Sequence, residues 1–114
     1  MDDCLAVIDG QEVLVARIGE EVAGFVSMWK PDNFLHHLFV LPKFQRAGIG
    51  KMLVTESIRQ FGLPMSLKCI KANTQACRFY ERLGFQAQEE GVGPEGPYIH
   101  YSRAKKYSFF EQAR

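Results

Sequence analysis

The chain has 114 residues, of which 46% are hydrophobic and 24% are charged, and its formal net charge is +1. This balance is typical of one globular domain and excludes an intrinsically disordered protein. A net charge near zero also excludes a broad basic surface for nucleic acid or for an anionic membrane, since the one basic run is residues 103–106. We therefore expect no nucleic-acid partner and no membrane partner.

The amino terminus and the cysteines indicate the compartment. The chain starts with Met-Asp-Asp and a short apolar run, whereas a secretory signal needs a basic start and a longer apolar region. No stretch approaches the length of a membrane-spanning helix. The three cysteines, Cys4, Cys69 and Cys77, are odd in number and lack CxxC spacing. We expect reduced thiols in a cytoplasmic protein, without a zinc site or any other metal.

The first half of the chain is typical of antiparallel sheet. Residues 12–18 and 22–29 are rich in Val, Leu and Ile and are joined by a turn at 19–21. A second turn at 31–33 leads to a third strand at 34–41, which is apolar on both parities and is predicted to be covered on both faces. Upstream, residues 5–8 fit either a short strand with a tight turn at 9–10 or the end of a helix.

The second half alternates between helical and extended patterns. A helix from Gly48 places apolar residues on one face and ends at Gly62 and Pro64. A strand follows at 65–71, and Asn73 is a good N-cap for a second helix that ends at Gly84.

The chain then finishes with two strands. Residues 85–87 and 98–102 are predicted to be extended, on either side of a Gly/Pro loop at 91–97. The order β-β-β-α-β-α-β-β predicts an α/β protein with a mixed sheet and helices on its faces.

Residues 38–51 carry the chemistry. A buried strand runs through a short loop into a helix whose first turn contains Gly48 and Gly50. The first helical turn has unpaired N–H groups and a partial positive charge, and glycines let an anion approach them closely. Arg46 and Lys51 add positive charge, so the segment predicts a phosphate site.

Two common nucleotide motifs are excluded by single residues. A Walker A loop needs Gly where Gln45 stands and Ser or Thr where Met52 stands. A dinucleotide fingerprint needs its third Gly where Leu53 stands. The phosphate ligand is therefore of another kind.

The hexapeptide Gln45-Arg46-Ala47-Gly48-Ile49-Gly50 resembles the Q/R-x-x-G-x-G/A pyrophosphate loop of the GNAT superfamily of N-acetyltransferases. The later segment Asn73-x-x-Ala76-x-x-Phe79-Tyr80-Glu81-x-Leu83-Gly84-Phe85 is similar to the second signature of that family. The resemblance covers residues 12–102. It implies an acyl-CoA N-acyltransferase (GNAT) fold and one N-acetyltransferase domain over residues 1–114. The implied activity is direct transfer of the acetyl group of acetyl-CoA to a primary amine, in a ternary complex and without a metal.

The resemblance also implies roles for single residues. The backbone of Leu38, Phe39 and Val40 would bind pantetheine and the acetyl carbonyl, with the Val40 N–H as oxyanion donor. The pyrophosphate would lie against Gln45, Arg46, Ala47, Gly48, Ile49, Gly50 and Lys51. Asn73 would contact the pantetheine arm, serve as N-cap, or do both.

Three side chains are candidates for proton transfer. Tyr80 matches the tyrosine that protonates the departing thiolate, although its spacing also fits a core position. His36 is the preferred base because it shares strand parity with Leu38 and Val40, and His37 is the second choice. A mechanism without a defined base also remains open.

The amino terminus departs from the family. About eleven residues precede the 12–29 hairpin, where most members have a strand and two helices, so the fold is expected to be shortened there. The acceptor groove would then be open, or completed by a second subunit in a homodimer. The tail over 104–114 carries Tyr107, Phe109 and Phe110, which indicates docking onto this chain or a partner.

A rival interpretation is a non-catalytic acyl-CoA-binding module whose acceptor site has degenerated. The sequence does not identify the acceptor amine, which is a small molecule or a peptide.

Overall fold

The computed structural model describes residues 2–8, by their backbone alone, and residues 11–104. The turn expected at 9–10, the side chain of Cys4 and the aromatic tail beyond residue 104 lie outside this described part. The elements in chain order are β1 (Asp2–Ile8), β2 (Gln11–Ile18), β3 (Glu21–Trp29), η1 (Lys30–Asp32), β4 (Phe34–Val40), η2 (Pro42–Ala47), α1 (Ile49–Phe61), β5 (Met65–Ile70), α2 (Thr74–Arg82), β6 (Gln86–Gly93) and β7 (Gly96–Arg103).

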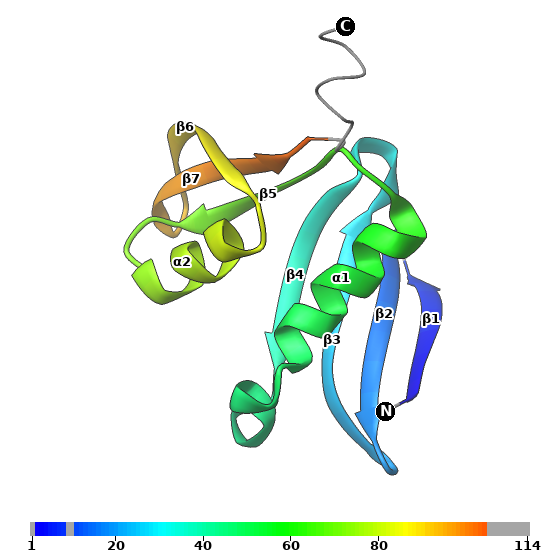
Figure 1. Ribbon diagram of the computed structural model, residues 1–114. Coiled ribbons are helices and arrows are strands. Elements are labelled where there is room, and N and C mark those ends of the chain that lie inside the picture. The colour runs from blue at the N-terminus through cyan, green and yellow to red at the C-terminus, as the bar shows by residue number, and fades with distance from the viewer. Residues whose placement is uncertain (1, 9–10, 105–114) are drawn as a thin grey trace, which may run out of the picture.

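The strands form one mixed sheet in the order β1-β2-β3-β4-β5-β7-β6. Antiparallel pairs account for both sides of this sheet, and β4 and β5 are the parallel neighbours in its centre. The parallel pairing covers only two positions, Phe34 with Ser66 and Leu35 with Leu67. Beyond them the two strands diverge, as Figure 1 shows. The predicted α/β class and the mixed sheet are confirmed.

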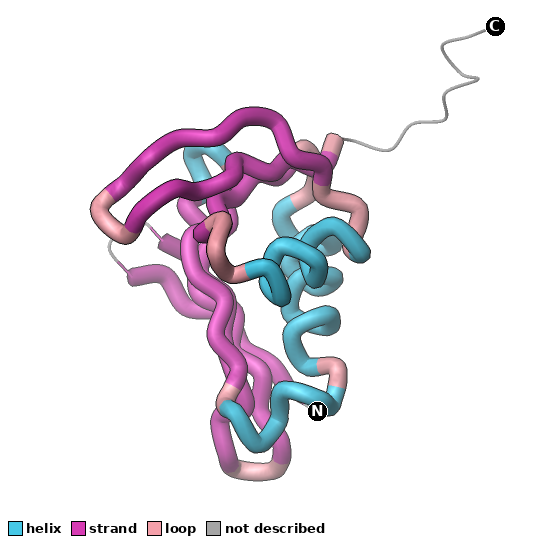
Figure 2. The backbone as a smooth tube through the Cα atoms, turned by 90° about the vertical axis from the view of Figure 1, so that its left-hand side faces the viewer, coloured by secondary structure: helices cyan, strands magenta, loops and turns pink. Residues whose placement is uncertain are grey.

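Both long helices pack on the same face of the sheet, as Figures 1 and 2 show. The buried side of α1 consists of Ile49, Leu53, Val54 and Ser57, which matches the 3.6-residue period of the sequence. It covers inward side chains of β2, β3 and β4, among them Leu14, Val26 and Leu35. Each such fully buried side chain stabilises the fold by about 1.5–3 kcal/mol.

The opposite face of the sheet, called the outer face below, is more open over β3 and β4. Trp29 is 39% exposed and Phe39 is 47% exposed. Residues 34–41 were predicted to be covered on both faces, and this prediction is wrong for the outer face. The apolar pattern on both parities has two causes. One side of β4 packs on α1, and the other side presents Phe39, which lies beside Phe25 of β3.

Two local predictions are settled by the backbone. Residues 5–8 belong to a strand, β1, which pairs antiparallel with β2, so the helical alternative is wrong. The loop predicted at 91–97 is also wrong, because β6 and β7 continue to Gly93 and Gly96 with a two-residue turn between them. The ring of Tyr98 packs against Gly91 at a place where a Cβ would collide with it. Gly91 therefore serves this cross-strand contact rather than a loop.

Candidate active site

The divergence of β4 and β5 opens a groove between these strands and α2. Two adjoining cavities of about 610 and 430 Å³ occupy it. Leu38 of β4, together with Asn73, Ala76 and Tyr80 at α2, lines both cavities. The larger cavity extends toward the histidines of β4, and the smaller one extends toward the start of α1.

Most of the residues predicted to bind phosphate gather at the smaller cavity. Its lining includes Gln45, Arg46, Gly48, Gly50 and Lys51, two of which are cations, and no acidic side chain of the described residues lines it. The predicted residues Ala47 and Ile49 are not part of this lining. Ile49 is 3% exposed and points into the core under α1.

The start of α1 leaves its first amides uncapped. Gly48 is the N-cap, it has a φ of 79°, and it has no side chain that could accept a hydrogen bond from the first turn. The N–H groups of that turn therefore have no partner within the helix and carry a partial positive charge. A Cβ at Gly50 would lie 3.3 Å from Cζ of Phe79, so this glycine allows α1 to begin close beside α2.

The backbone of β4 offers donors to the groove. The N–H of Leu41 donates to the carbonyl of Ala23 on β3 at 2.8 Å. Since N–H groups alternate in direction along a strand, the N–H of Val40 points the other way, toward β5. The pairing with β5 has already ended at Leu35, so the Val40 amide faces the groove. The Val40 carbonyl accepts a hydrogen bond from Nε2 of Gln45 at 3.2 Å.

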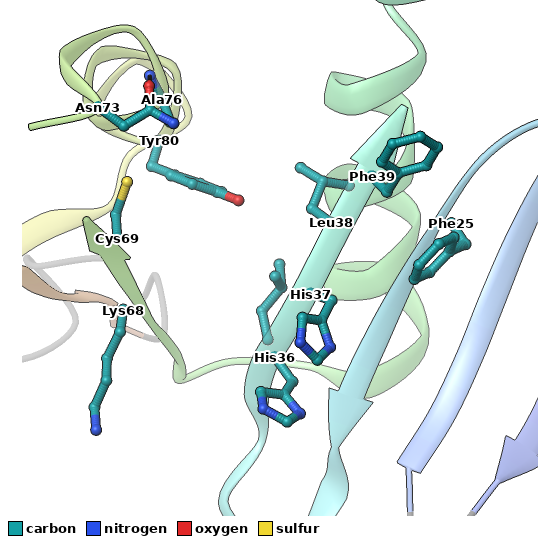
Figure 3. Close-up of a pocket in the computed structure, with 11 residues that line it drawn as sticks. Phe25, His36, His37, Leu38, Phe39, Lys68, Cys69, Asn73, Ala76 and Tyr80 are labelled. Carbon is teal, nitrogen blue, oxygen red and sulfur yellow. Dashed lines mark hydrogen bonds between the residues drawn. The ribbon is translucent and has the colours of Figure 1, made fainter. Parts of the chain in front are cut away.

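The predicted N-cap role of Asn73 is confirmed, because its Oδ1 accepts the N–H of Ala76 at 3.1 Å. One turn further along α2, Tyr80 makes edge-on contacts with the rings of Phe79 and Phe85. Figure 3 shows its hydroxyl pointing into the space between α2 and β4. Burial, followed by the charge of a Cys69 thiolate, raises the pKa of Tyr80 to about 12, so the phenol is protonated near neutral pH.

The two histidines lie at a β-bulge. His37 pairs with Ser27 and Leu35 pairs with Met28, so His36 is an additional residue in β4 with no partner in β3. The bulge reverses the strand parity, and Leu35 rather than His36 shares the inward face of Leu38. The parity argument for His36 is therefore wrong.

Despite this change of face, His36 lines the larger cavity, and His37 does so as well. The ring centroids of the two histidines are 4.1 Å apart. Nδ1 of His36 lies 2.7 Å from the side-chain amide nitrogen of Gln11. Partial desolvation, and then the positive charge of a protonated His37, lower the pKa of His36 below its ordinary value.

A sequence model of the Acetyltransferase (GNAT) family matches residues 2–85. The chain belongs to the GNAT family. It is 32% identical to an uncharacterized N-acetyltransferase of Archaeoglobus fulgidus over an alignment that covers 73% of this chain and 65% of that protein.

Solved structures show the same GNAT fold. A Bacillus anthracis protein described as a streptothricin acetyltransferase, in complex with acetyl coenzyme A, superimposes with a TM-score of 0.74 at 20% identity. That match covers 85% of this chain and 64% of the other. An N-acetyltransferase of Staphylococcus aureus gives a TM-score of 0.73 at 16% identity, over 79% of this chain and 68% of the other. This chain thus spans about two thirds of the length of these GNAT relatives.

The residues of this GNAT chain fit a coenzyme A ligand at the smaller cavity. Uncapped helix amides, Arg46 and Lys51 suit a diphosphate, and space is open at Gly48, where a Cβ would meet nothing within 4 Å. No three potential metal ligands gather among residues 11–104 whose side chains are described. Within the same part of the chain, no helix is long and apolar enough to cross a membrane.

Sequence reasoning missed several residues that line the larger cavity of this GNAT site. Lys68 of β5 contributes to it, as do Phe25 of β3 and Leu35 of β4. The contribution of Lys68 depends on the pairing between β4 and β5, which joins segments about thirty residues apart. The one sequence signal was the mixed polarity of the 65–71 strand, in which Lys68 is exposed between buried neighbours.

Proposed function

We propose that this GNAT chain is an N-acetyltransferase that transfers the acetyl group of acetyl-CoA directly to a primary amine. The observation that supports the proposal is one continuous groove with two chemically different ends. Uncapped amides and cations line one end, and a tyrosine hydroxyl with two histidines lines the other.

Coenzyme A binding would use the smaller cavity. The first-turn amides of α1, with Arg46 and Lys51, would hold the diphosphate, and the exposed backbone of Leu38 to Val40 would hydrogen-bond to the pantetheine arm. Asn73 lies at the point where the two cavities meet, so it can contact that arm while it caps α2. Acetyl-CoA supplies an activated thioester, in which the acetyl carbon is open to attack.

The Val40 amide is our candidate oxyanion donor. When an amine adds to the thioester carbon, the carbonyl oxygen gains negative charge, and an amide already directed at the groove stabilises it without reorganisation. One such donor contributes about 2.7–4 kcal/mol to the transition state. The hydrogen bond from Gln45 to the Val40 carbonyl supports the geometry of this segment.

Tyr80 is our candidate acid. Its phenol is protonated and directed into the groove, so it can donate a hydrogen bond to the thiolate as the carbon–sulfur bond breaks. With a phenol pKa of about 12 and a thiol pKa of ~8.5, complete proton transfer before release would cost about 5 kcal/mol. We infer that hydrogen-bond donation is the main contribution of Tyr80, and that solvent completes the protonation.

His36 is our preferred base and His37 the second choice. A lowered pKa keeps His36 neutral, and therefore able to accept the proton of the amine, down to a lower pH. For Nε2 to be the free base, Nδ1 must carry the proton and donate it to the Gln11 side chain. The buried Oε1 of Gln11 has no hydrogen-bond partner among the described residues. If the oxygen and the nitrogen of this side-chain amide exchange places, Oε1 lies beside Nδ1 of His36 and accepts its proton.

The rival function is a non-catalytic acyl-CoA-binding module. The openness of the outer face beside the histidines, with Phe39 and Trp29 exposed, favours it. The exposed Phe39 also supports our proposal of a homodimer, in which a second copy packs beside this residue and completes the wall of the acceptor groove. A strictly monomeric sedimentation profile would contradict the dimer. The cytoplasm is the compartment we propose, since the sulfurs of Cys69 and Cys77 lie 3.6 Å apart as free thiols.

Two measurements distinguish the enzyme from the module. Isothermal titration with coenzyme A tests the binding half, and an Arg46→Ala, Lys51→Ala double variant should weaken that binding at least tenfold. Release of free thiol from acetyl-CoA with a panel of primary amines tests the transfer half. Tight binding without thiol release for any amine would support the non-catalytic module.

A further inference from the structure

We propose that the acceptor is a small amine that also carries a carboxylate, and that Lys68 binds this carboxylate beside His36. This inference rests on the proposed acetyl transfer and specifies its acceptor.

Lys68 and His36 lie where three cavities meet. Both line the larger groove cavity, a separate cavity of about 430 Å³ beside Asp32 on the outer face, and a cavity of about 550 Å³ beside the β6–β7 turn. Lys68 belongs to β5 and His36 to β4, so they flank the gap from opposite strands, as Figure 3 shows. Lys68 alternates with the buried Leu67 and Cys69 and therefore points to the outer face. An acceptor arriving from that face meets Lys68 before it reaches Tyr80.

The charges around this junction favour an anion. In the described part of the chain, Lys68 is the only charged side chain that lines the larger cavity, apart from the two histidines when protonated. Its ammonium lies 4.8 Å from the ring centroid of Tyr98, and none of the four ion pairs among the described residues includes it. The Tyr98 ring thus favours this orientation of the lysine side chain, while its charge is available to a ligand.

The acids near the junction are peripheral. Asp32 lines only the cavity beside η1, and Glu95 lines only the cavity beside the β6–β7 turn. A polycationic acceptor would therefore meet Lys68 at the groove without a facing carboxylate. An acceptor with its own carboxylate would instead neutralise Lys68 and enter with its charges matched.

The chemistry of the amine points the same way. An α-amino group at a chain terminus has a pKa of about 8, against about 10.4 for a lysine-type amine. In a free amino acid the adjacent carboxylate raises the pKa of the amine, because its negative charge favours the protonated form. Pairing of that carboxylate with the Lys68 ammonium offsets this increase, so a bound amino acid needs less free energy for deprotonation than a lysine-type amine.

Matched acceptor pairs test this proposal. Thiol release from acetyl-CoA is measured for a series of amino acids, for their carboxamides and for spermidine, with wild type, Lys68→Gln and Lys71→Gln. Lys71 is a suitable control because its ammonium pairs with Glu90 and lines none of the cavities. We expect the acids to exceed their amides at least tenfold in kcat/KM. Lys68→Gln should abolish that ratio, mainly by raising KM for the acids, and Lys71→Gln should preserve it.

The possible results distinguish the carboxylate site from acetyl transfer itself. Equal rates for acids and amides in wild type, or a preference for spermidine, would overturn the carboxylate site and leave acetyl transfer intact. Absence of thiol release with every amine would overturn both. The comparison of acids with amides in wild type needs no variant, and coenzyme A titration of Lys68→Gln establishes that this variant retains its fold.

Discussion

The hydroxyl of Tyr101 donates a hydrogen bond of 2.7 Å to Oε2 of Glu81, and so joins the buried centre of β7 to the residue that follows Tyr80 on α2. Tyr101 is fully buried, and burial together with this bond raises its pKa. The contact therefore links the core beneath the site to the helix that carries the candidate acid.

Tyr101→Phe should destabilise the protein and loosen α2. The variant would lose its hydrogen bond to Glu81, an exposed carboxylate that water can solvate instead, at a cost of about 0.5–1.5 kcal/mol. Urea denaturation followed by circular dichroism measures this change. Because Tyr101 acts through α2 rather than on the substrates, we expect kcat to fall while the affinity for coenzyme A stays within twofold. Thr55→Ala on the exposed side of α1 is a suitable surface control.

Tyr80→Phe should lower kcat by about 10- to 100-fold, with little effect on coenzyme A binding, because positioned proton donors contribute on this scale. The ring contacts with Phe79 and Phe85 are retained in the variant, so folding should be preserved. Single-turnover kinetics and titration with coenzyme A provide the two readouts. An unchanged kcat would remove Tyr80 from the mechanism.

The pH dependence tests His36. Since its pKa is lowered, the neutral ring persists to lower pH, and kcat/KM should fall with acid only below about pH 6.5. His36→Gln should slow the reaction and remove this acid limb. Gln11→Glu would place a carboxylate beside Nδ1, which favours the protonated ring, so the limb should move to higher pH.

His37→Gln is the internal control for that profile. It removes a neighbouring positive charge, so the pKa of His36 should rise toward its ordinary value while most of the activity is kept. If His37→Gln instead abolishes the acid limb, His37 is the base and the preference for His36 was wrong. An acid limb that survives both variants would indicate a mechanism without a histidine base.

The sequence was informative wherever the determining interaction is local. The N-cap at Asn73, the apolar face of α1 and the glycines at its start were predicted from residues within one or two turns. The bulge at His36 was not, because it arises from a mismatch in residue count between β3 and β4. Lys68 was missed for a similar reason, since its position depends on where the β4–β5 pairing stops.

Gly48 permits a separate test of backbone conformation at the proposed phosphate site. Its φ of 79° is in the left-handed region, where a Cβ costs about 1 kcal/mol, and the space around it is open, so Gly48→Ala should introduce strain without a collision. We expect a loss of about 1 kcal/mol in the free energy of unfolding and a weaker coenzyme A affinity, because relief of the strain reorients the first amides of α1. Gly48→Asn should recover part of both losses, since Asn tolerates the left-handed region better than Ala.

Gly19→Ala is the matched control for Gly48→Ala, because Gly19 also has positive φ with open space but lies in the β2–β3 turn. A similar loss of coenzyme A affinity in both alanine variants would show that the effect comes from general destabilisation and not from the amides of α1.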